Sequence, residues 1–300
     1  MPNHATFQQT GTDADSPAGD PREFRFTDGD FARVRELIHR TAGIALTPVK
    51  RDLVYGRLAR RLRVRGLSSF ADYLRILESG DRQEQVEFVN ALTTNLTSFF
   101  REPHHFPILA DHLKGPGGRR PLSIWCCAAS TGEEPYSIAM TVVEQFGTFT
   151  PPVRILATDI DTSVLDRARQ GIYRLDRTSP LHREQLKRFF LRGDGSNSGL
   201  ARVRPELRKL VTFRRLNLLD PEWPMRERFD VIFCRNVMIY FDKETQYAIL
   251  RKFVPLLHPD GLLFAGHSES FHHAADLFQV RGKTVYAVRE GAPFPPGRRS

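Results

Sequence analysis

Short apolar runs recur through the chain after residue 120, and stretches with helical periodicity separate most of them. Short apolar runs are typical of strands buried on both faces of a sheet, and intervening helices allow successive strands to lie parallel. The pattern predicts an α/β fold with a doubly wound parallel sheet. The expected strands are Leu122–Cys127, Val153–Ala157, Leu210–Phe213, Val231–Cys234, Leu262–Ala265 and Val285–Val288.

The turn after the first run points to a ligand. It runs from Ala128 to Tyr136 as AASTGEEPY and leads into an apolar-periodic helix. Small residues allow the backbone to approach a ligand, and Asp159 at the tip of the next strand can accept hydrogen bonds from ribose hydroxyls. The segment therefore predicts a nucleoside site. Asp159 has a simpler alternative role as a helix N-cap, but Asp161 or Thr162 can fill that role instead.

Composition bounds the class of partner. The chain has 44 Lys and Arg residues against 35 Asp and Glu residues, a net charge of +9, which predicts an acidic partner such as a nucleic acid, a membrane surface or a protein. No window approaches the roughly 20 apolar residues of a membrane span, and the N-terminus lacks a secretory pattern. The three cysteines fall in predicted strands without Cys-x-x-Cys spacing, so we expect core packing in a reducing cytoplasm.

Polar stretches and apolar periods divide the chain into parts. Residues 1–25 are rich in Thr, Asp, Gly and Pro and are expected to form a disordered tail. Residues 26–92 are expected to form an all-helical N-terminal domain, and 93–118 a linker and a helix. The α/β domain is placed at 119–290, followed by a C-terminal tail at 291–300.

Helix signals support the N-terminal assignment. A threonine followed three residues later by an acid favours a helix start, proline favours the first helical turn, and glycine favours a helix end. These signals are Thr27 with Asp30, Gly43, Pro48, Gly66 and Ser69 with Asp72, and a fourth helix is expected from Glu84 to Leu92.

One stretch departs from the α/β alternation. About fifty residues separate Asp159 from Leu210, more than a single crossover needs. Phe189–Leu191 and Leu200–Val203 read as short strands around a glycine-rich turn. We therefore expect an inserted antiparallel hairpin, in a small β-subdomain at about 186–209.

Four motifs, taken in order, closely resemble the CheR-type chemotaxis receptor methyltransferases. They are NALTTNLTSFFRE at 90–102, ASTGEEPYS at 129–137, FCRNVMIYF at 233–241 and DGLLFAGHSE at 260–269. The resemblance covers residues 28–290. It implies methylation of receptor glutamate side chains by S-adenosylmethionine (SAM), with S-adenosylhomocysteine as product. It also implies a helical N-terminal domain and a Rossmann-like SAM methyltransferase sheet with an inserted β-subdomain.

The resemblance further implies which residues surround the cofactor. Glu134 suits the SAM ammonium, although Glu133 and Glu134 can simply favour the helix dipole. Arg101 suits the SAM carboxylate through its planar guanidinium, and Tyr240 is implied beside the transferred methyl group; both are assigned to catalysis. From the residues alone, Arg101 has the alternative of a surface charge and Tyr240 that of a half-buried packing aromatic. Without the resemblance, Asn217 is equally well explained as an ordinary turn residue. The expected cofactor-binding residues are Asn95, Thr97, Arg101, Ser130, Glu134, Asp159, Asn217, Leu218, Arg235 and Asn236.

A basic helix and a glycine-rich hairpin are the expected receptor contacts. Residues 50–65 contain seven basic residues and one acid, and like charges one helical turn apart repel, so an acidic partner is expected. The resemblance implies that this partner is the methylation region of the receptor, bound by Arg57, Arg60 and Arg61. In some members of the family the β-subdomain adds a peptide from the receptor C-terminus as a strand, which implies a role for Gly193, Gly195 and Gly199.

Two rival functions remain for comparison. A nucleic-acid methyltransferase would fit the positive charge, but no aromatic-interleaved basic patch or RNA-binding module is present. A non-catalytic SAM-sensing receptor adaptor would not need the full set of site residues. His267 and Glu269 resemble a metal pair but lack a third ligand at suitable spacing, so no metal is expected and both are treated as loop residues near the substrate. We expect a monomer that neither binds nucleic acid nor inserts into a membrane.

Overall fold

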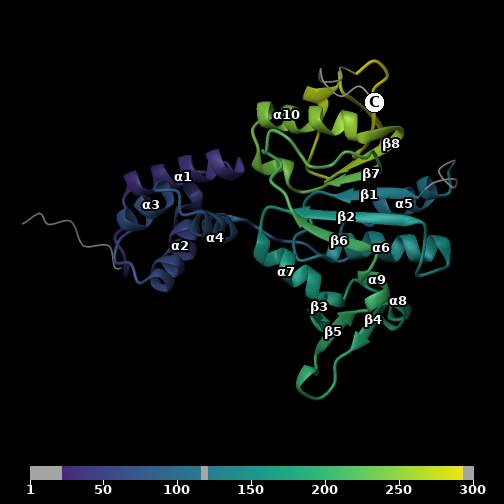
Figure 1. Ribbon diagram of the computed structural model, residues 1–300, viewed down its shortest axis with the longest axis horizontal. Coiled ribbons are helices and arrows are strands. Elements are labelled where there is room, and N and C mark those ends of the chain that lie inside the picture. The colour runs from purple at the N-terminus through teal and green to yellow at the C-terminus, as the bar shows by residue number, and fades with distance from the viewer. Residues whose placement is uncertain (1–21, 116–120, 293–300) are drawn as a thin grey trace, which may run out of the picture.

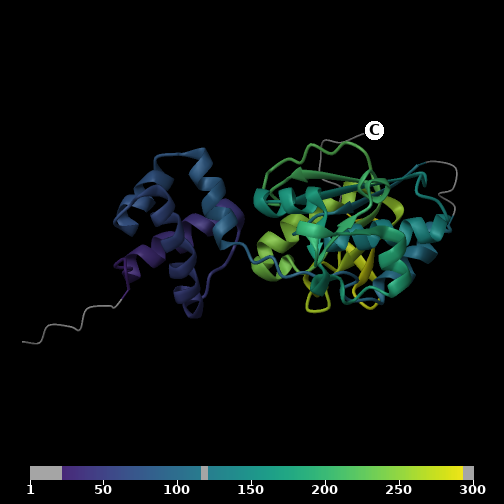
Figure 2. The ribbon, with the colours of Figure 1, turned by 90° about the horizontal axis from the view of Figure 1, so that it is seen from below.

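The computed structural model describes residues 22–115 and 121–292. A helical N-terminal part stands beside a larger α/β part, and a small sheet projects from the latter (Figures 1 and 2). Residues 1–21 of the expected N-terminal tail, 116–120 of the expected linker and 293–300 of the C-terminal tail lie outside the described residues. Within the described ranges, no helix has the length and apolar character needed to cross a membrane.

Four helices build the N-terminal part. α1 (Asp28–Ala42) begins with the capping box of Thr27 and Asp30, and α2 (Arg51–Arg65) follows a 3-10 turn at Pro48–Lys50. Ser69 caps α3 (Phe70–Glu78), and α4 spans Arg82–Leu92. The glycines after α1 and α2 both adopt the left-handed conformation that ends a helix. The helix signals of the sequence are confirmed.

The core of this bundle includes a residue expected in the tail. Phe24 is only 8% exposed, its ring meets Phe70 edge to face with centroids 6.4 Å apart, and its backbone N–H donates to the Tyr55 hydroxyl. The prediction that the disordered tail extends to residue 25 is therefore wrong at Phe24. A buried aromatic ring offsets the entropy lost on ordering that part of the chain.

A seven-stranded sheet forms the centre of the α/β part. Its order is β6-β2-β1-β7-β8-β10-β9, and the first five strands are parallel. The strands are β1 (Leu122–Cys126), β2 (Val153–Asp159), β6 (Val211–Arg215), β7 (Phe229–Cys234), β8 (Leu257–Ala265), β9 (Phe278–Gly282) and β10 (Val285–Val288). The Rossmann-like α/β class and all six expected strands are confirmed.

The far edge of the sheet differs from the expectation of parallel strands throughout. β10 runs antiparallel to β8, and β9, which the sequence did not reveal, runs antiparallel to β10. Between β8 and β9 there is a single short 3-10 turn at His272–Ala274, and two residues join β9 to β10. The connection from β9 to β10 is far too short for the crossover of about a dozen residues that a parallel pair requires. β9 escaped notice because it is largely exposed after Phe278.

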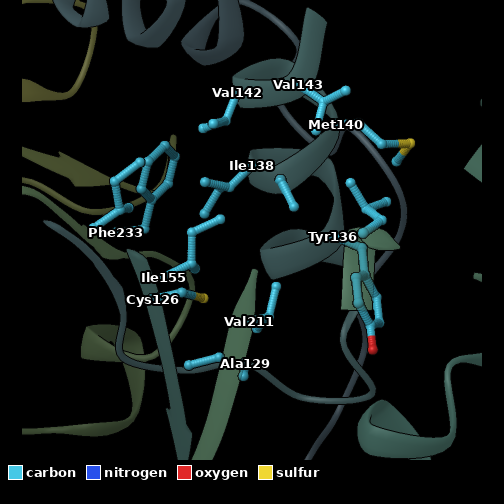
Figure 3. Close-up of a cluster of buried hydrophobic side chains, with 14 of the residues drawn as sticks. Cys126, Ala129, Tyr136, Ile138, Met140, Val142, Val143, Ile155, Val211 and Phe233 are labelled. Carbon is cyan, nitrogen blue, oxygen red and sulfur yellow. The ribbon is translucent and has the colours of Figure 1, made fainter. Parts of the chain in front are cut away.

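Helices cover both faces of the sheet. On β1, Ile124 and Cys126 face the cluster that contains α5 (His105–Leu113), α6 (Glu133–Phe146) and α7 (Thr162–Gln170). Trp125 faces the opposite cluster, which contains α10 (Lys243–Phe253). Figure 3 shows the first cluster, where side chains of α6 lie over the strand residues. All three cysteines are free and buried, as expected of core residues.

The inserted β-subdomain has three strands, not two. β4 (Phe190–Arg192) and β5 (Leu200–Val203) form the expected antiparallel hairpin, and β3 (Ile172–Arg174) pairs with the other side of β5. α8 (Arg183–Phe189) and α9 (Pro205–Arg208) flank these strands. The sheet thus begins at Ile172, earlier than the expected start near residue 186, because a three-residue strand leaves almost no sequence pattern. It projects from the domain in Figure 1.

Candidate functional site

A pocket lies where the carboxyl ends of the parallel strands meet the N-terminal helices. Its empty space, with the open mouth included, is about 1120 Å³. Pockets of several hundred Å³ are typical of sites for small-molecule ligands. Every residue assigned from the sequence to the cofactor or to catalysis lines it: Asn95, Thr97, Arg101, Ser130, Glu134, Asp159, Asn217, Leu218, Arg235, Asn236 and Tyr240. The geometry brings them together, and their individual roles stay predictions.

Asp159 ends β2 at the floor of this pocket. Its carboxylate accepts hydrogen bonds from the backbone N–H groups of Ser130 (2.8 Å) and Asp161 (3.0 Å). Burial raises its pKa to about 6, so burial outweighs these hydrogen bonds, which favour the ionised form. Asp161, and not Asp159, accepts the N-terminal hydrogen bonds of α7. The alternative role of Asp159 as a helix cap is therefore wrong.

The single glycine of the turn is required by its surroundings. Gly132 has φ of 99°, and an added Cβ would lie 2.8 Å from the Tyr173 hydroxyl and 2.9 Å from Cβ of Ala168. Ser130 also has a positive φ, of 48°. This tight turn brings the backbone of Ser130 onto Asp159 and aims the N-terminus of α6 at the pocket, which suits close approach of a ligand.

Glu134 and Arg235 form a buried ion pair beneath the pocket. Nη1 of Arg235 lies 2.5 Å from Oε2 of Glu134, and the arginine side chain is fully buried. The Cys126 thiol donates to the other oxygen of Glu134 at 3.3 Å. Nη2 of Arg235 donates to the carbonyl oxygen of Arg101 at 2.5 Å. Glu134 is thus held in place by a protein cation before any ligand arrives.

Glu102 is a site residue that the sequence did not reveal. Its carboxylate lies 3.3 Å from Nη2 of Arg235 and 3.0 Å from Nδ1 of His267. Burial raises the pKa of Glu102, but the hydrogen bond from His267 and the charge of Arg235 outweigh it and lower the pKa to about 2. Glu102 also has a positive φ, of 55°. Glu102 follows Arg101 in the first motif, and nothing in that motif indicates a contact with Arg235 or His267, which lie far along the chain.

Glu269 holds the backbone that precedes Tyr240. One carboxylate oxygen accepts from the N–H groups of Val237 and Met238, at 2.9 and 2.8 Å. The other accepts from Asn236 at 2.9 Å and from Gly266 at 2.5 Å. Glu269 lies in a loop after β8, as expected, and is 5% exposed, so it is a buried support of this turn. Its expected position near the substrate stays a prediction.

Tyr240 and Lys50 meet at the junction of the two parts of the chain. The ammonium of Lys50 lies 5.7 Å from the centroid of the Tyr240 ring. The Ala45 N–H donates to the Tyr240 carbonyl at 3.2 Å. Both side chains line the pocket. Lys50 was expected only as one of the seven basic residues at 50–65. Its position over Tyr240 depends on the packing of the two parts of the chain, which the sequence pattern did not indicate.

The remaining pocket residues have partners that position the linker and turns. Asn95 donates to Asp161 at 2.8 Å, and Nη1 of Arg101 donates to the Leu96 carbonyl at 2.9 Å. Asn217 donates to the Thr41 carbonyl at 2.8 Å and accepts from the Leu219 N–H. Asn217 therefore serves as a turn residue and lines the pocket at the same time.

Several arginines of α2 have partners within the helical bundle. Arg57 donates to the carbonyl oxygens of Leu92 and Thr93, at the end of α4. Arg61 pairs with two acids of α4, Glu84 and Glu87, at 2.9 and 3.2 Å. Arg60 is exposed and, within the described part of the chain, has no acidic partner. Arg51, Arg63 and Arg65 also have acidic partners within the chain, which are Asp28, Glu23 and Asp81. The expectation that the charges of this helix require an outside acidic partner is thus wrong for these three arginines and for Arg61. Receptor binding by Arg57, Arg60 and Arg61 stays a prediction.

Two family models match the chain, one in each of its two parts. The model of the CheR methyltransferase SAM-binding domain matches residues 95–287, and that of the CheR methyltransferase all-alpha domain matches residues 29–93. The chain belongs to the CheR methyltransferase family.

Individual relatives of the family cover most of the chain. Chemotaxis protein methyltransferase 2 of Pseudomonas aeruginosa is 56% identical over 277 residues, which is 92% of this chain and 99% of the relative. The chemotaxis protein methyltransferase of Escherichia coli is 55% identical over 263 residues, covering 87% and 91%. The chain is thus a SAM-dependent methyltransferase of chemotaxis, and SAM is its cofactor.

Proposed function

We propose that this protein transfers the methyl group of SAM to the γ-carboxylate of glutamate side chains on chemotaxis receptors. The products are a glutamyl methyl ester and S-adenosylhomocysteine. The observation that carries the proposal is the kind of charge in the pocket. Lys50 and Arg101 are its partly exposed cations, whereas Glu134 and Asp159 are less than 10% exposed. An incoming carboxylate therefore meets positive groups before negative ones.

Methyl transfer to a carboxylate does not require a strong general base. A glutamate with the ordinary pKa of about 4.3 is already ionised at pH 7. Histidine, the commonest general base, is absent from the described residues that line the pocket, and burial raises the pKa of its cysteine, Cys127, which keeps the thiol protonated. This inventory supports a substrate that arrives as an anion and needs no deprotonation.

The reaction is a direct displacement. A glutamate oxygen forms a bond to the methyl carbon while the bond from carbon to sulfur breaks, and the sulfur keeps the electron pair. The protein contributes mainly by aligning oxygen, carbon and sulfur. In our assignment Asp159 binds the ribose, Glu134 the ammonium and Arg101 the carboxylate of SAM. Tyr240, on the turn that Glu269 supports, shapes the place of methyl transfer.

A labelling experiment tests this function. The full chain is incubated with methyl-labelled SAM and membranes that contain chemoreceptors, and base-labile label on the receptor is measured as released methanol. Arg101→Ala is expected to lower kcat/KM at least tenfold, since a charged hydrogen bond contributes about 1.5–3 kcal/mol. Arg154→Ala, which removes an exposed ion pair with Glu227, is the control and should leave turnover unchanged.

The outcomes separate the rival functions. Label on nucleic acid would support a nucleic-acid methyltransferase, and SAM binding without transfer to any receptor would support an adaptor. Near wild-type turnover of Arg101→Ala would overturn the role of Arg101 but not the function.

We further propose that the β-subdomain binds a peptide at the receptor C-terminus by adding a strand. β3 and β4 are the outer strands of its sheet and have free edges available for pairing. Residues 172–209 contain ten basic and four acidic residues, which favours an acidic peptide. An added Cβ on Gly193 would clash with the Asn197 carbonyl at 2.1 Å, so this glycine maintains the loop itself. Absence of binding in calorimetry with the free peptide would contradict the proposal.

A further inference from the structure

Large apolar side chains are exposed around the mouth of the pocket. Val49 is 93% exposed, Leu96 75%, Ile239 51% and Leu53 43%. They come from three segments: the 3-10 turn at Pro48–Lys50 with the start of α2, the linker after α4, and the turn that carries Tyr240. We call these four residues the apolar collar.

The position of the collar follows from its neighbours. Leu53 and Leu96 line the pocket directly. Val49 precedes Lys50, and Ile239 precedes Tyr240. Lys50 and Tyr240 both line the pocket, and the Lys50 ammonium lies 5.7 Å from the centroid of the Tyr240 ring. The hydrogen bond from Ala45 to the Tyr240 carbonyl joins the same two segments. Two members of the collar thus line the pocket and the other two adjoin pocket-lining residues, which places the collar beside the pocket.

The charge and exposure of the residues at the collar indicate which kind of partner would bind there. Clustered exposed apolar side chains on a protein surface commonly mark an interaction site. Here the cluster adjoins Lys50, a partly exposed cation that is not assigned to SAM, while Glu134 and Asp159 of the pocket are buried. A complementary partner presents an acidic side chain surrounded by apolar ones.

We propose that the collar docks the apolar side chains of the receptor helix that carries the methylated glutamate. This inference rests on the function proposed above and names the surface that selects its substrate. On a helix, the side chains three and four positions from a glutamate lie about 5–6 Å from it on the same face. When the glutamate enters the pocket toward Lys50, those neighbours meet the collar. Apolar contact then supplies affinity, and the positive charge of Lys50 favours an acidic side chain.

The collar is distinct from the β-subdomain in what it recognises. The β-subdomain carries much of the basic charge and free strand edges, which suit an extended acidic peptide. The collar is apolar and bounded by helices and turns. Loss of the collar is therefore expected to raise the KM for the receptor even when a tethering peptide still binds.

Paired substitutions test the collar. Val49→Ser with Ile239→Ser removes apolar surface at two exposed positions that do not line the pocket. Val64→Ser with Val280→Ser removes similar surface at sites 66% and 58% exposed that are not near pocket-lining residues in sequence. The assays are the KM for receptor membranes in the labelling reaction and the affinity for S-adenosylhomocysteine in calorimetry.

The collar variant is expected to raise the KM at least tenfold, since burial of each of its two apolar side chains contributes roughly 1.5 kcal/mol. Its affinity for S-adenosylhomocysteine and the KM of the control variant should not change. An unchanged KM for the collar variant, with ester formation intact, would overturn the collar and leave the proposed function standing. Failure of the unmodified protein to form any receptor ester would instead overturn the proposed function.

Discussion

Replacing Arg235 with alanine should destabilise the α/β part by about 3–5 kcal/mol. The guanidinium is fully buried and lies 2.5 Å from Glu134 and 3.3 Å from Glu102. Both carboxylates are less than 10% exposed. Removal of one member of a buried pair leaves an uncompensated charge, and losses of about 3–5 kcal/mol are typical. Here two acids lose their cation at once, so the upper part of that range is expected.

Tryptophan fluorescence isolates the relevant transition. The chain has two tryptophans, Trp125 and Trp223, and their rings pack edge to face 5.1 Å apart in the core of the α/β part. Their signal during urea or thermal unfolding therefore reports this part and not the helical bundle. At roughly 2–4 °C per kcal/mol for a domain of this size, the expected fall in Tm is about 6–20 °C.

Two further variants show whether buried charge is the cause. Arg154→Ala breaks an ion pair whose side chains are 68% and 74% exposed, and it should cost less than about 1 kcal/mol. Arg235→Met combined with Glu134→Gln removes both charges of the closest pair and should recover part of the loss. A loss below about 1 kcal/mol for Arg235→Ala alone would refute the reasoning, because the acids would then be stable without their cation.

Three other substitutions test separate parts of the site. Because the pKa of Asp159 is raised to about 6 and ribose hydroxyls need an ionised acceptor, affinity for S-adenosylhomocysteine should fall as pH drops below 6, up to tenfold per unit; Asp159→Asn should remove this dependence in calorimetry. Glu269→Gln weakens four backbone contacts and should lower the free energy of unfolding in urea by about 1.5–3 kcal/mol. Gly132→Ala should weaken ligand binding strongly, whereas Gly147→Ala, also at positive φ but in open space, should cost about 1 kcal/mol of stability and no affinity.

Local chemistry made the helices predictable. Thr27 with Asp30, and Ser69 with Asp72, form their caps within three or four residues of sequence, so no distant contact is needed to place them. The buried strands were equally clear, because both faces of β1 and β7 are covered and nearly every residue is apolar. β3 and β9 were missed because they are short or exposed, and their pairing depends on neighbours far along the chain.

The site residues could also be predicted only in part, because strand ends can be recognised locally whereas contacts between distant residues cannot. Residues at the ends of parallel strands, such as Asp159 and Arg235, could be grouped because those ends meet at one edge of the sheet. Their partners could not be inferred from spacing. Glu102 reaches Arg235 across 133 positions, and Arg61 finds Glu84 on a different helix. A charge pattern along one helix indicates a need for counter-charges, but only the packing shows whether they lie inside the chain or on a partner.

The helical part contributes directly to the pocket and is hydrogen-bonded to the α/β part. Asn217 donates to the Thr41 carbonyl, Ala45 donates to the Tyr240 carbonyl, and Asn90 donates to the hydroxyl of Thr162 at 3.0 Å. These bonds tie the helices to three separate strand ends or turns of the α/β part. Lys50 and Leu53 then form one wall of the pocket. Leu53 of α2 both lines the pocket and belongs to the proposed collar. If the collar binds the receptor as proposed, cofactor and receptor meet on one surface, which favours the alignment that methyl transfer requires.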